Sequence, residues 1–247
     1  MKTIPYPVSE KRVMWDSLHS DEIWPAYYLS KLMRSGIITT KELEGKHVLD
    51  IGCGASFGRS SKSDYIENSH FIAQLAELYV GCDISGYVLA EARKIISVYP
   101  LKEKCALVLA DAKELPFADG SFDTVIMIDT LYLLGNDAFS ALKECTRVSR
   151  GQIIITAFHS DGLDPTIPTI PSQKGKEYGT ITQKSWSPIE QIFFTKEQMS
   201  LILDELGLNG KIFVLTNHEY DSLRSSEESY PSATVNELIV VKASKRP

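Results

Sequence analysis

Two kinds of hydrophobic pattern alternate along this chain. Short, continuous apolar runs are typical of strands that a sheet buries on both faces. They occur at His47–Ile51, Tyr79–Asp83, Ala106–Ala110, Thr124–Ile128 and Gln152–Phe158. Between these runs, apolar residues recur every three or four positions, which predicts helices. Strand and helix therefore alternate as in βαβ units, and right-handed crossovers between them predict a doubly wound parallel sheet.

Several helix boundaries are marked by capping residues. One helix lies over about Phe71–Glu77, Ser85 caps the next, and Asn136 caps a third. After the last of the five strand runs, residues 159–192 carry four prolines and predict a long irregular insertion. Thr195 with Gln198 then forms a capping box at the start of a helix that Gly207 ends. Two further strands, Lys211–Thr216 and Leu238–Val241, close the pattern.

The first 44 residues differ from the rest. Residues 1–20 hold two early prolines and predict an irregular arm, whereas Asp21–Gly36 predicts a helix. We expect this helix either to pack on the sheet or to form a lid over a ligand, with Tyr27 or Tyr28 reaching that ligand. We therefore divide the chain into an N-terminal arm and lid, 1–44, and a main domain, 45–247, whose insertion 159–192 covers the site.

Composition narrows the classes of function. The chain has 247 residues and a formal net charge of −6, which argues against charge-driven binding of nucleic acid. Its four cysteines form no CxxC pair, so we interpret them as reduced core thiols and expect no metal site. No apolar run has the length of a signal peptide or a membrane span, so we expect a cytoplasmic protein that binds no membrane.

The stretch HVLDIGCGASFG, residues 47–58, joins a buried strand to a glycine-rich turn. Gly52 and Gly54 stand where a side chain would strain the backbone or block a ligand. Acidic residues also follow four consecutive strand runs, at Asp50, Asp83, Asp111 and Asp129. Each acid alone is explained equally well as a cap. Four of them on one rim of a parallel sheet are better explained by a ligand, because open α/β sheets bind ligands at that edge.

The turn, the segment GCDIS at 81–85 and the run LVLADAKELPFADGSFDTVIMIDTLYLL at 107–134 resemble, in this order, the class I S-adenosylmethionine-dependent methyltransferases. The resemblance covers residues 45–160 best, and the PFADGSFDTV segment is similar to the subgroup that methylates small molecules. It implies a Rossmann-like, seven-stranded, mostly parallel sheet with helices on both faces and one antiparallel strand in a final hairpin. The turn departs from the family pattern, because Ser56 replaces its third glycine.

The resemblance assigns the cofactor, S-adenosylmethionine (SAM), and its product S-adenosylhomocysteine (SAH). The methionyl end of SAM is expected at Asp50 and the turn, the ribose at Asp83, the adenine beside Ile84 and Asp111, and the sulfonium near Asp129. The full set of expected cofactor contacts is Asp50, Gly52, Gly54, Ser56, Asp83, Ile84, Asp111, Ala112, Asp129 and Thr130.

The acceptor side is less determined by the sequence. His159 is the candidate general base if the acceptor must lose a proton, with a pocket wall as the alternative. Tyr178 and Trp186 either line an acceptor pocket or attach the insertion to the sheet. We expect a small-molecule acceptor methylated on oxygen, nitrogen or carbon, and a monomer or homodimer. Two rivals stay open: an RNA or protein methyltransferase, and a non-catalytic cofactor-binding module.

Overall fold

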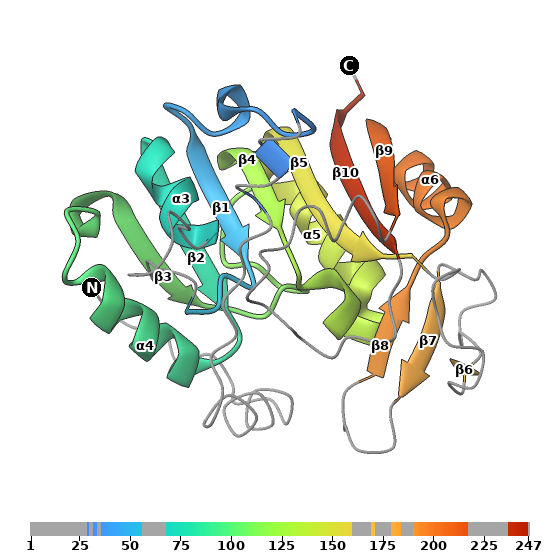
Figure 1. Ribbon diagram of the computed structural model, residues 1–247, viewed down its shortest axis with the longest axis horizontal. Helices are drawn as coiled ribbons and strands as arrows, with labels where there is room; N and C mark the ends of the chain where they lie inside the picture. The colour runs from blue at the N-terminus through green and yellow to red at the C-terminus, as the bar shows by residue number, and fades with distance from the viewer. Residues whose placement is uncertain are drawn as a thin grey trace.

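The computed structural model describes residues 29, 32–33, 36–55, 68–159, 169–170, 179–183, 190–216 and 237–246. Its main element is a seven-stranded sheet in the order β3-β2-β1-β4-β5-β10-β9 (Figure 1). The strands are β1 (His47–Ile51), β2 (Leu78–Asp83), β3 (Cys105–Leu109), β4 (Phe122–Met127), β5 (Ser149–Phe158), β9 (Leu208–Thr216) and β10 (Glu237–Lys245). The predicted fold class, including the closing strand pair, is confirmed.

The strand order reverses next to β1. From β1 the chain builds outward through β2 to β3, then crosses to β4 on the other side of β1. Strands β1 to β5 are mutually parallel, and β10 runs antiparallel to both of its neighbours. The carboxyl ends of β1 and β4 therefore flank a topological switch point, which is where open α/β sheets bind ligands.

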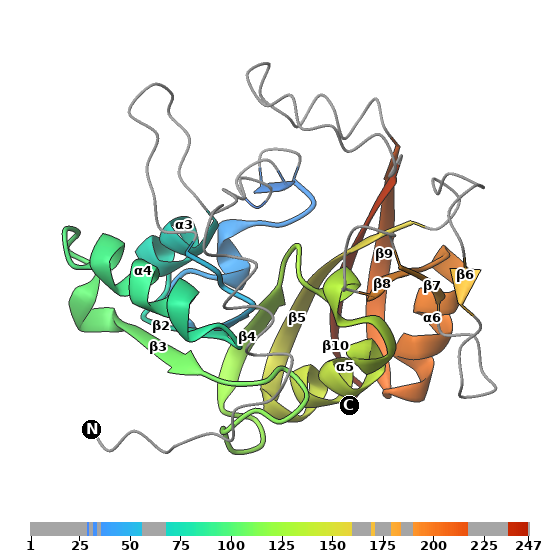
Figure 2. The ribbon, with the colours of Figure 1, turned by 90° about the horizontal axis from the view of Figure 1, so that it is seen from below.

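Helices cover both faces of the sheet. The bounds are α3 (Asn68–Leu75), α4 (Gly86–Ile96), α5 (Ala138–Val148) and α6 (Lys196–Glu205), with short 3-10 segments η1 (Thr40–Glu42), η2 (Lys102–Lys104) and η3 (Leu131–Asp137). One hydrophobic cluster joins α5 and α6 to the sheet, and a second joins α3 and α4 to the opposite face. Figure 2 shows α3 and α4 at one end of the sheet and α6 beside β9 at the other.

The capping predictions hold at two helices and fail at one. Ser85 accepts the amide of Val88 at 3.2 Å at the start of α4. Thr195 and Gln198 form the predicted reciprocal capping box of α6. Asn136 does not cap α5, because η3 continues to Asp137, which occupies the N-cap position. A 3-10 segment leading directly into an α-helix leaves no separate sequence signal for the boundary.

Strand β3 corrects the prediction that its run is covered on both faces. All five of its residues are only partly buried, because β3 is the edge strand and pairs with β2 alone. An apolar run in the sequence shows that a segment is partly enclosed, but it does not distinguish an inner strand from an edge strand.

The insertion after β5 is not wholly irregular. It contains a second, three-stranded antiparallel sheet of β6 (Thr169–Ile170), β7 (Thr180–Gln183) and β8 (Glu190–Phe193). Figures 1 and 2 place this small sheet beside α6, away from α4. Strands of two to four residues separated by prolines give little periodic signal, which explains why the sequence predicted only irregular chain.

Several apolar side chains from the described part of the first 44 residues belong to the core. Leu29, Leu32 and Ile38 are fully buried against the cluster that includes α3 and α4. Gly36, at φ 75°, donates its amide to the carbonyl of Met33, as expected at the end of a helix. The remaining residues of the predicted lid, Tyr27 and Tyr28 among them, lie outside the described residues, so the boundary at 44 stays a prediction.

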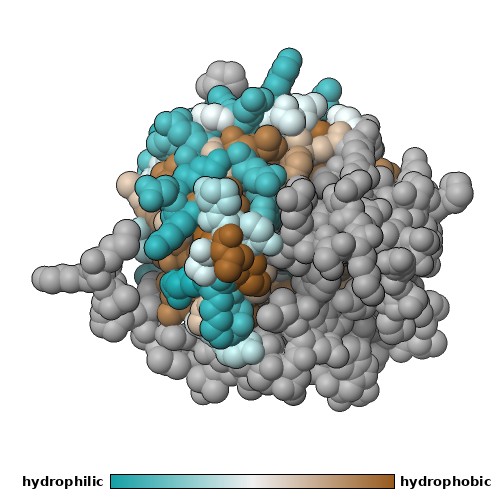
Figure 3. Space-filling model, turned by 60° about the vertical axis from the view of Figure 1, so that its left-hand side comes forward, coloured by the Kyte–Doolittle hydropathy of each residue, from teal (hydrophilic) through white to brown (hydrophobic). Residues whose placement is uncertain are grey.

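The surface over the α4 side is mixed. Figure 3 shows hydrophilic side chains interspersed with small hydrophobic groups on this face. Large hydrophobic side chains that are exposed among the described residues are Tyr87, Val98 and Leu201, on separate parts of the fold. No helix in the described ranges is long and apolar enough to cross a membrane.

Candidate active site

The four predicted acids gather at one edge of the sheet. Asp50 stands in β1 opposite Gly81 of β2 and Ile126 of β4. Asp83 is the last residue of β2, and Asp111 and Asp129 lie two residues beyond β3 and β4. Because these strands are parallel and adjacent, the acids follow one another along the rim that contains the switch point.

The glycine turn is fastened to β2 by its backbone. Gly52 and Gly54 adopt φ values of 71° and 58°, in the left-handed region that favours glycine. The amides of Gly52 and Cys53 donate to the carbonyl of Cys82 at 2.8 and 3.1 Å. Gly54 donates to Oδ2 of Asp83 at 3.1 Å, while Oδ1 accepts the amide of Ser85 at 2.9 Å. Asp83 thus connects the turn to the start of α4.

Thr130 fills the space directly above Gly52. Its Oγ1 lies 3.4 Å from the carbonyl oxygen of Gly52 and 3.0 Å from that of Ile128. A Cβ atom built on Gly52 would lie only 2.3 Å from this Oγ1. Glycine is therefore required here by contact within the protein as well as by backbone conformation. The contact joins the turn after β1 to the end of β4 across the switch point.

Asp50 is enclosed beneath the turn. Only 4% of its surface is exposed, and its Oδ2 accepts hydrogen bonds of 2.8 Å from the hydroxyls of Ser69 and Tyr79. Burial raises the pKa of Asp50 to about 6, the charge of Asp83 acts in the same direction, and the two hydroxyl donors oppose both. Burial also keeps the pKa of Tyr79 well above its usual value, so this hydroxyl stays a donor.

This pKa predicts a pH dependence of cofactor binding. Above pH 6 Asp50 is mostly ionised and would attract the ammonium group of bound SAM, and below pH 6 it becomes mostly neutral. We expect the affinity for SAM to fall about fivefold between pH 7.5 and pH 5, measured by calorimetry. Asp50→Asn keeps the shape and accepts from both hydroxyls, so its affinity should be lower at pH 7.5 and change little over the same range. An equally steep pH dependence in this variant would assign the effect to another group.

Local contacts hold the part of the rim at the ends of β2 and β3. Asp111 accepts the amide of Lys113 at 3.0 Å, and the Lys113 ammonium lies 3.8 Å from Asp111 and 3.2 Å from Asp137. Ala110 donates its amide to the carbonyl of Asp83 at 3.0 Å, which ties the ends of β2 and β3 together. Ile84 and Ala112 are partly exposed beside these groups.

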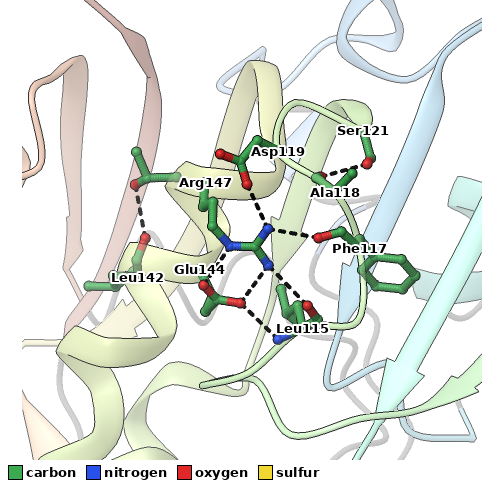
Figure 4. A network of polar contacts seen from close by, with 9 residues as sticks. Leu115, Phe117, Ala118, Asp119, Ser121, Leu142, Glu144 and Arg147 are labelled. Carbon is green, nitrogen blue, oxygen red and sulfur yellow. Dashed lines mark hydrogen bonds and ion pairs between the residues drawn. The ribbon is translucent and has the colours of Figure 1, made fainter. Parts of the chain in front are cut away.

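The segment that follows Asp111 depends on Arg147 of α5 (Figure 4). The guanidinium of Arg147 donates to the carbonyls of Phe117 and Leu115 at 2.7 and 3.0 Å. It also forms a bidentate salt bridge with Glu144, with hydrogen bonds of 2.7 and 2.8 Å, and a second salt bridge with Asp119 at 2.8 Å. Glu144 in turn accepts the amide of Leu115 at 2.8 Å. One planar side chain therefore holds the loop between β3 and β4.

Replacing Arg147 should weaken the fold. Arg147→Lys keeps the charge but loses the planar fork, leaving loop carbonyls without their donors. We expect a loss of about 2–3 kcal/mol in the free energy of unfolding, or about 5–10 °C in Tm, measured by scanning calorimetry. Arg150→Lys is the matched control, because within the described ranges Arg150 pairs with Asp123 alone and is half exposed; the variant should cost less than about 1 kcal/mol. Equal losses in both variants would contradict this role.

The acceptor-side roles stay predictions, and the structure describes only some of the residues concerned. His159 is 6% exposed, follows β5 directly and pairs with Phe194 beyond β8. Glu197, in the first turn of α6, interacts electrostatically with His159. Phe158, next to His159, packs edge-to-face on Tyr132 of η3 with ring centroids 4.6 Å apart. Other predicted contact residues lie outside the described residues: Ser56, Tyr27, Tyr28, Tyr178 and Trp186.

A family model matches the central part of this chain. Residues 49–155, which run from β1 to β5, match the family model described as a methyltransferase domain. The central part of the chain, which is less than half of its length, therefore matches a methyltransferase domain. The family predicted from the glycine turn and the acidic strand ends is thereby confirmed.

Known proteins resemble this methyltransferase domain at modest identity. An O-methyltransferase of Pyrenophora dematioidea is 32% identical over 106 residues, which are 43% of this chain and 36% of that protein. The chain thus matches little more than a third of this relative's length.

Two solved structures show the extent of the likeness in fold. The magnesium protoporphyrin IX methyltransferase of Synechocystis PCC 6803, solved with bound SAH, has a TM-score of 0.52 and 18% identity, covering 88% of this chain and 80% of its own. The cyclase SpnF has a TM-score of 0.62 and 16% identity, covering 99% of both chains. Proteins that are named for different reactions therefore share this fold.

Sequence reasoning missed three residues that complete the rim of the methyltransferase domain: Ser69, Tyr79 and Thr156. Ser69 and Tyr79 hold Asp50, and Thr156 accepts the amide of Asp129 at 2.8 Å. Thr156 interrupts the otherwise apolar run of β5, and a buried hydroxyl requires a hydrogen-bond partner. That signal was present in the sequence. Ser69 had none, because α3 lies far from Asp50 along the chain.

Proposed function

We propose that the protein is a SAM-dependent methyltransferase that acts on a small-molecule acceptor. The observation that carries this proposal is the rim of four carboxylates around a left-handed glycine turn at the switch point of the sheet. SAM bears a positive sulfonium, a positive ammonium and a ribose diol, and carboxylates are suitable partners for all three.

Each part of the rim fits one part of the cofactor. Asp83, at the end of β2, accepts the amides of Gly54 and Ser85 and would also accept from the two ribose hydroxyls. The left-handed turn at Gly52 and Gly54, with Thr130 packed over Gly52, would face the methionyl end. Asp111 with Ala112 would meet the adenine amino group, and Ile84 would pack on the ring. Asp129 and Thr130 would lie nearest the sulfonium.

Bound SAM supplies an already activated methyl group, so the protein's residues have two tasks, to align the acceptor and to exclude water. His159 would serve as general base where the acceptor carries a proton that must leave. Its position at the carboxyl end of β5 supports this role, and the charge of Glu197 interacts with it at longer range. Glu197 would stabilise the imidazolium that forms.

The acceptor would lie between the rim and the insertion. Tyr132 and Phe158 are both partly exposed, and they stand beyond β4 and at the end of β5. Phe193 of β8 completes the aromatic group, with its ring centroid 6.3 Å from that of Phe158. These rings would favour an apolar, small acceptor, and the net charge of −6 disfavours nucleic acid. The relative of Pyrenophora dematioidea is named for transfer to oxygen.

The test is methyl uptake from isotope-labelled SAM. The protein is incubated with pools of small phenols, carboxylic acids and amines, with total RNA, and with protein extract. Label in a small molecule supports the proposal, and label in RNA or protein shows the rival methyltransferase class. If SAM binds but no pool is labelled, the chain is a cofactor-binding module or uses the fold for another reaction, as the name of the cyclase SpnF illustrates.

A further inference from the structure

Asp129 has an unusual backbone conformation. Among the described residues it is the only non-glycine residue with a positive φ, at 54°. The left-handed region is unfavourable for an L-residue, although aspartate tolerates it better than most. Such strained residues persist where their surroundings hold them, and they concentrate at functional sites. Asp129 stands two residues beyond β4, at the switch point.

A hydrogen bond from the neighbouring strand holds this conformation. The amide of Asp129 donates to Oγ1 of Thr156 at 2.8 Å. Thr156 is 2% exposed and lies in β5 between Ile155 and Ala157, which are buried in the core. The regular pairing of β4 with β5 ends at Met127 and Ile155, so a side chain receives the next strand-end amide instead of a backbone carbonyl.

A second contact fixes the residue that follows. Oγ1 of Thr130 lies 3.0 Å from the carbonyl of Ile128 and 3.4 Å from that of Gly52. Asp129 is therefore held between two points, Thr156 of β5 on one side and the glycine turn of β1 on the other. If the bond to Thr156 is lost, the backbone of Asp129 is free to leave the strained conformation, and its carboxylate then changes direction.

We propose that Thr156 is a positioning residue that fixes the backbone of Asp129 so that the carboxylate faces the sulfonium of bound SAM. This inference rests on the proposed function. Thr156 is too deeply buried to meet a ligand, so it acts only through Asp129. The carboxylate would favour SAM over SAH, because only SAM carries the positive sulfur.

The ratio of the two affinities tests this role without knowledge of the acceptor. Calorimetric titrations with SAM and with SAH are made on wild type, Thr156→Val and Thr156→Ser. Valine has nearly the shape of threonine but no hydroxyl, and serine keeps the hydroxyl. We expect the preference for SAM over SAH to fall about fivefold in Thr156→Val and to stay within about twofold of wild type in Thr156→Ser. Asp129→Asn should lose the same preference.

The possible outcomes separate the inference from the proposed function. If wild type binds neither compound, the proposed function fails. If wild type binds SAM and Thr156→Val weakens SAM and SAH equally, Thr156 has only a structural role and the inference is overturned. If Thr156→Val does not fold, Thr156→Ala replaces it, since alanine also lacks the hydroxyl and adds no methyl group. The ratio of the affinities for SAM and SAH is then compared in the same way. Retention of the wild-type ratio by folded Thr156→Val or Thr156→Ala would also overturn the inference.

Discussion

Replacement of Asp83 by alanine should weaken SAM binding about 100-fold. In the proposed binding mode the variant loses the acceptor for two ribose hydroxyls, and charge-assisted bonds of this kind contribute about 1.5–3 kcal/mol each. It also loses the bonds from Gly54 and Ser85 that fasten the turn. The two Kd values are measured by titration calorimetry at the same pH and salt concentration.

Two controls make this prediction specific. Asp204→Ala removes a carboxylate of equal charge from α6, where Asp204 pairs with Arg246 on the surface, so its affinity should match wild type. Asp83→Asn preserves the size of the side chain and part of its capacity to accept hydrogen bonds. Its affinity for SAM should therefore lie between those of wild type and Asp83→Ala. Affinity in Asp83→Ala within about threefold of wild type would exclude Asp83 as a cofactor contact.

Gly52→Ala should lower both the stability and the affinity for SAM. Its φ of 71° strains any L-residue, and the new methyl group would lie 2.3 Å from Oγ1 of Thr130. We expect a loss of about 2–4 kcal/mol in the free energy of unfolding, from strain and overpacking together. Urea titration measures this loss, and calorimetry measures the loss of affinity.

Gly207→Ala is the matched control for this variant. Gly207 has a φ of 67°, but nothing lies within 4 Å of the Cβ that alanine would add. Gly207→Ala should therefore lower the free energy of unfolding by about 1 kcal/mol, which is the cost of the backbone strain alone. The double variant Gly52→Ala with Thr130→Gly removes the clash and should recover part of the loss. If Gly52→Ala and Gly207→Ala lower the free energy of unfolding equally, contact with Thr130 is not a reason why position 52 requires glycine.

The sheet was the most predictable part of the fold. Buried strands such as β1 and β4 have continuous apolar runs, and their alternation with helices leaves few topologies. The small sheet β6–β8 was missed because its strands have at most four residues each. The edge position of β3 was missed because strand order is a tertiary property, and local hydrophobicity does not encode it.

The site was predictable where an acidic residue stands at or just beyond the carboxyl end of a strand. Asp50, Asp83, Asp111 and Asp129 could be placed on one rim because parallel strands end at the same edge of a sheet. Their supporting partners were not predictable. The hydroxyls that hold Asp50 come from α3 and β2, and the conformation of Asp129 depends on a side chain 27 residues away. Such long-range hydrogen bonds become visible only when the chain is folded.

The measurement that tests the central claim most directly is a calorimetric titration of the wild-type protein with SAM, repeated with SAH. The rim of carboxylates around the turn predicts saturable binding at one site per chain, with SAM preferred over SAH at pH 7.5. Absence of heat, together with no rise in Tm at millimolar SAM, would contradict the claim that this rim is a cofactor site.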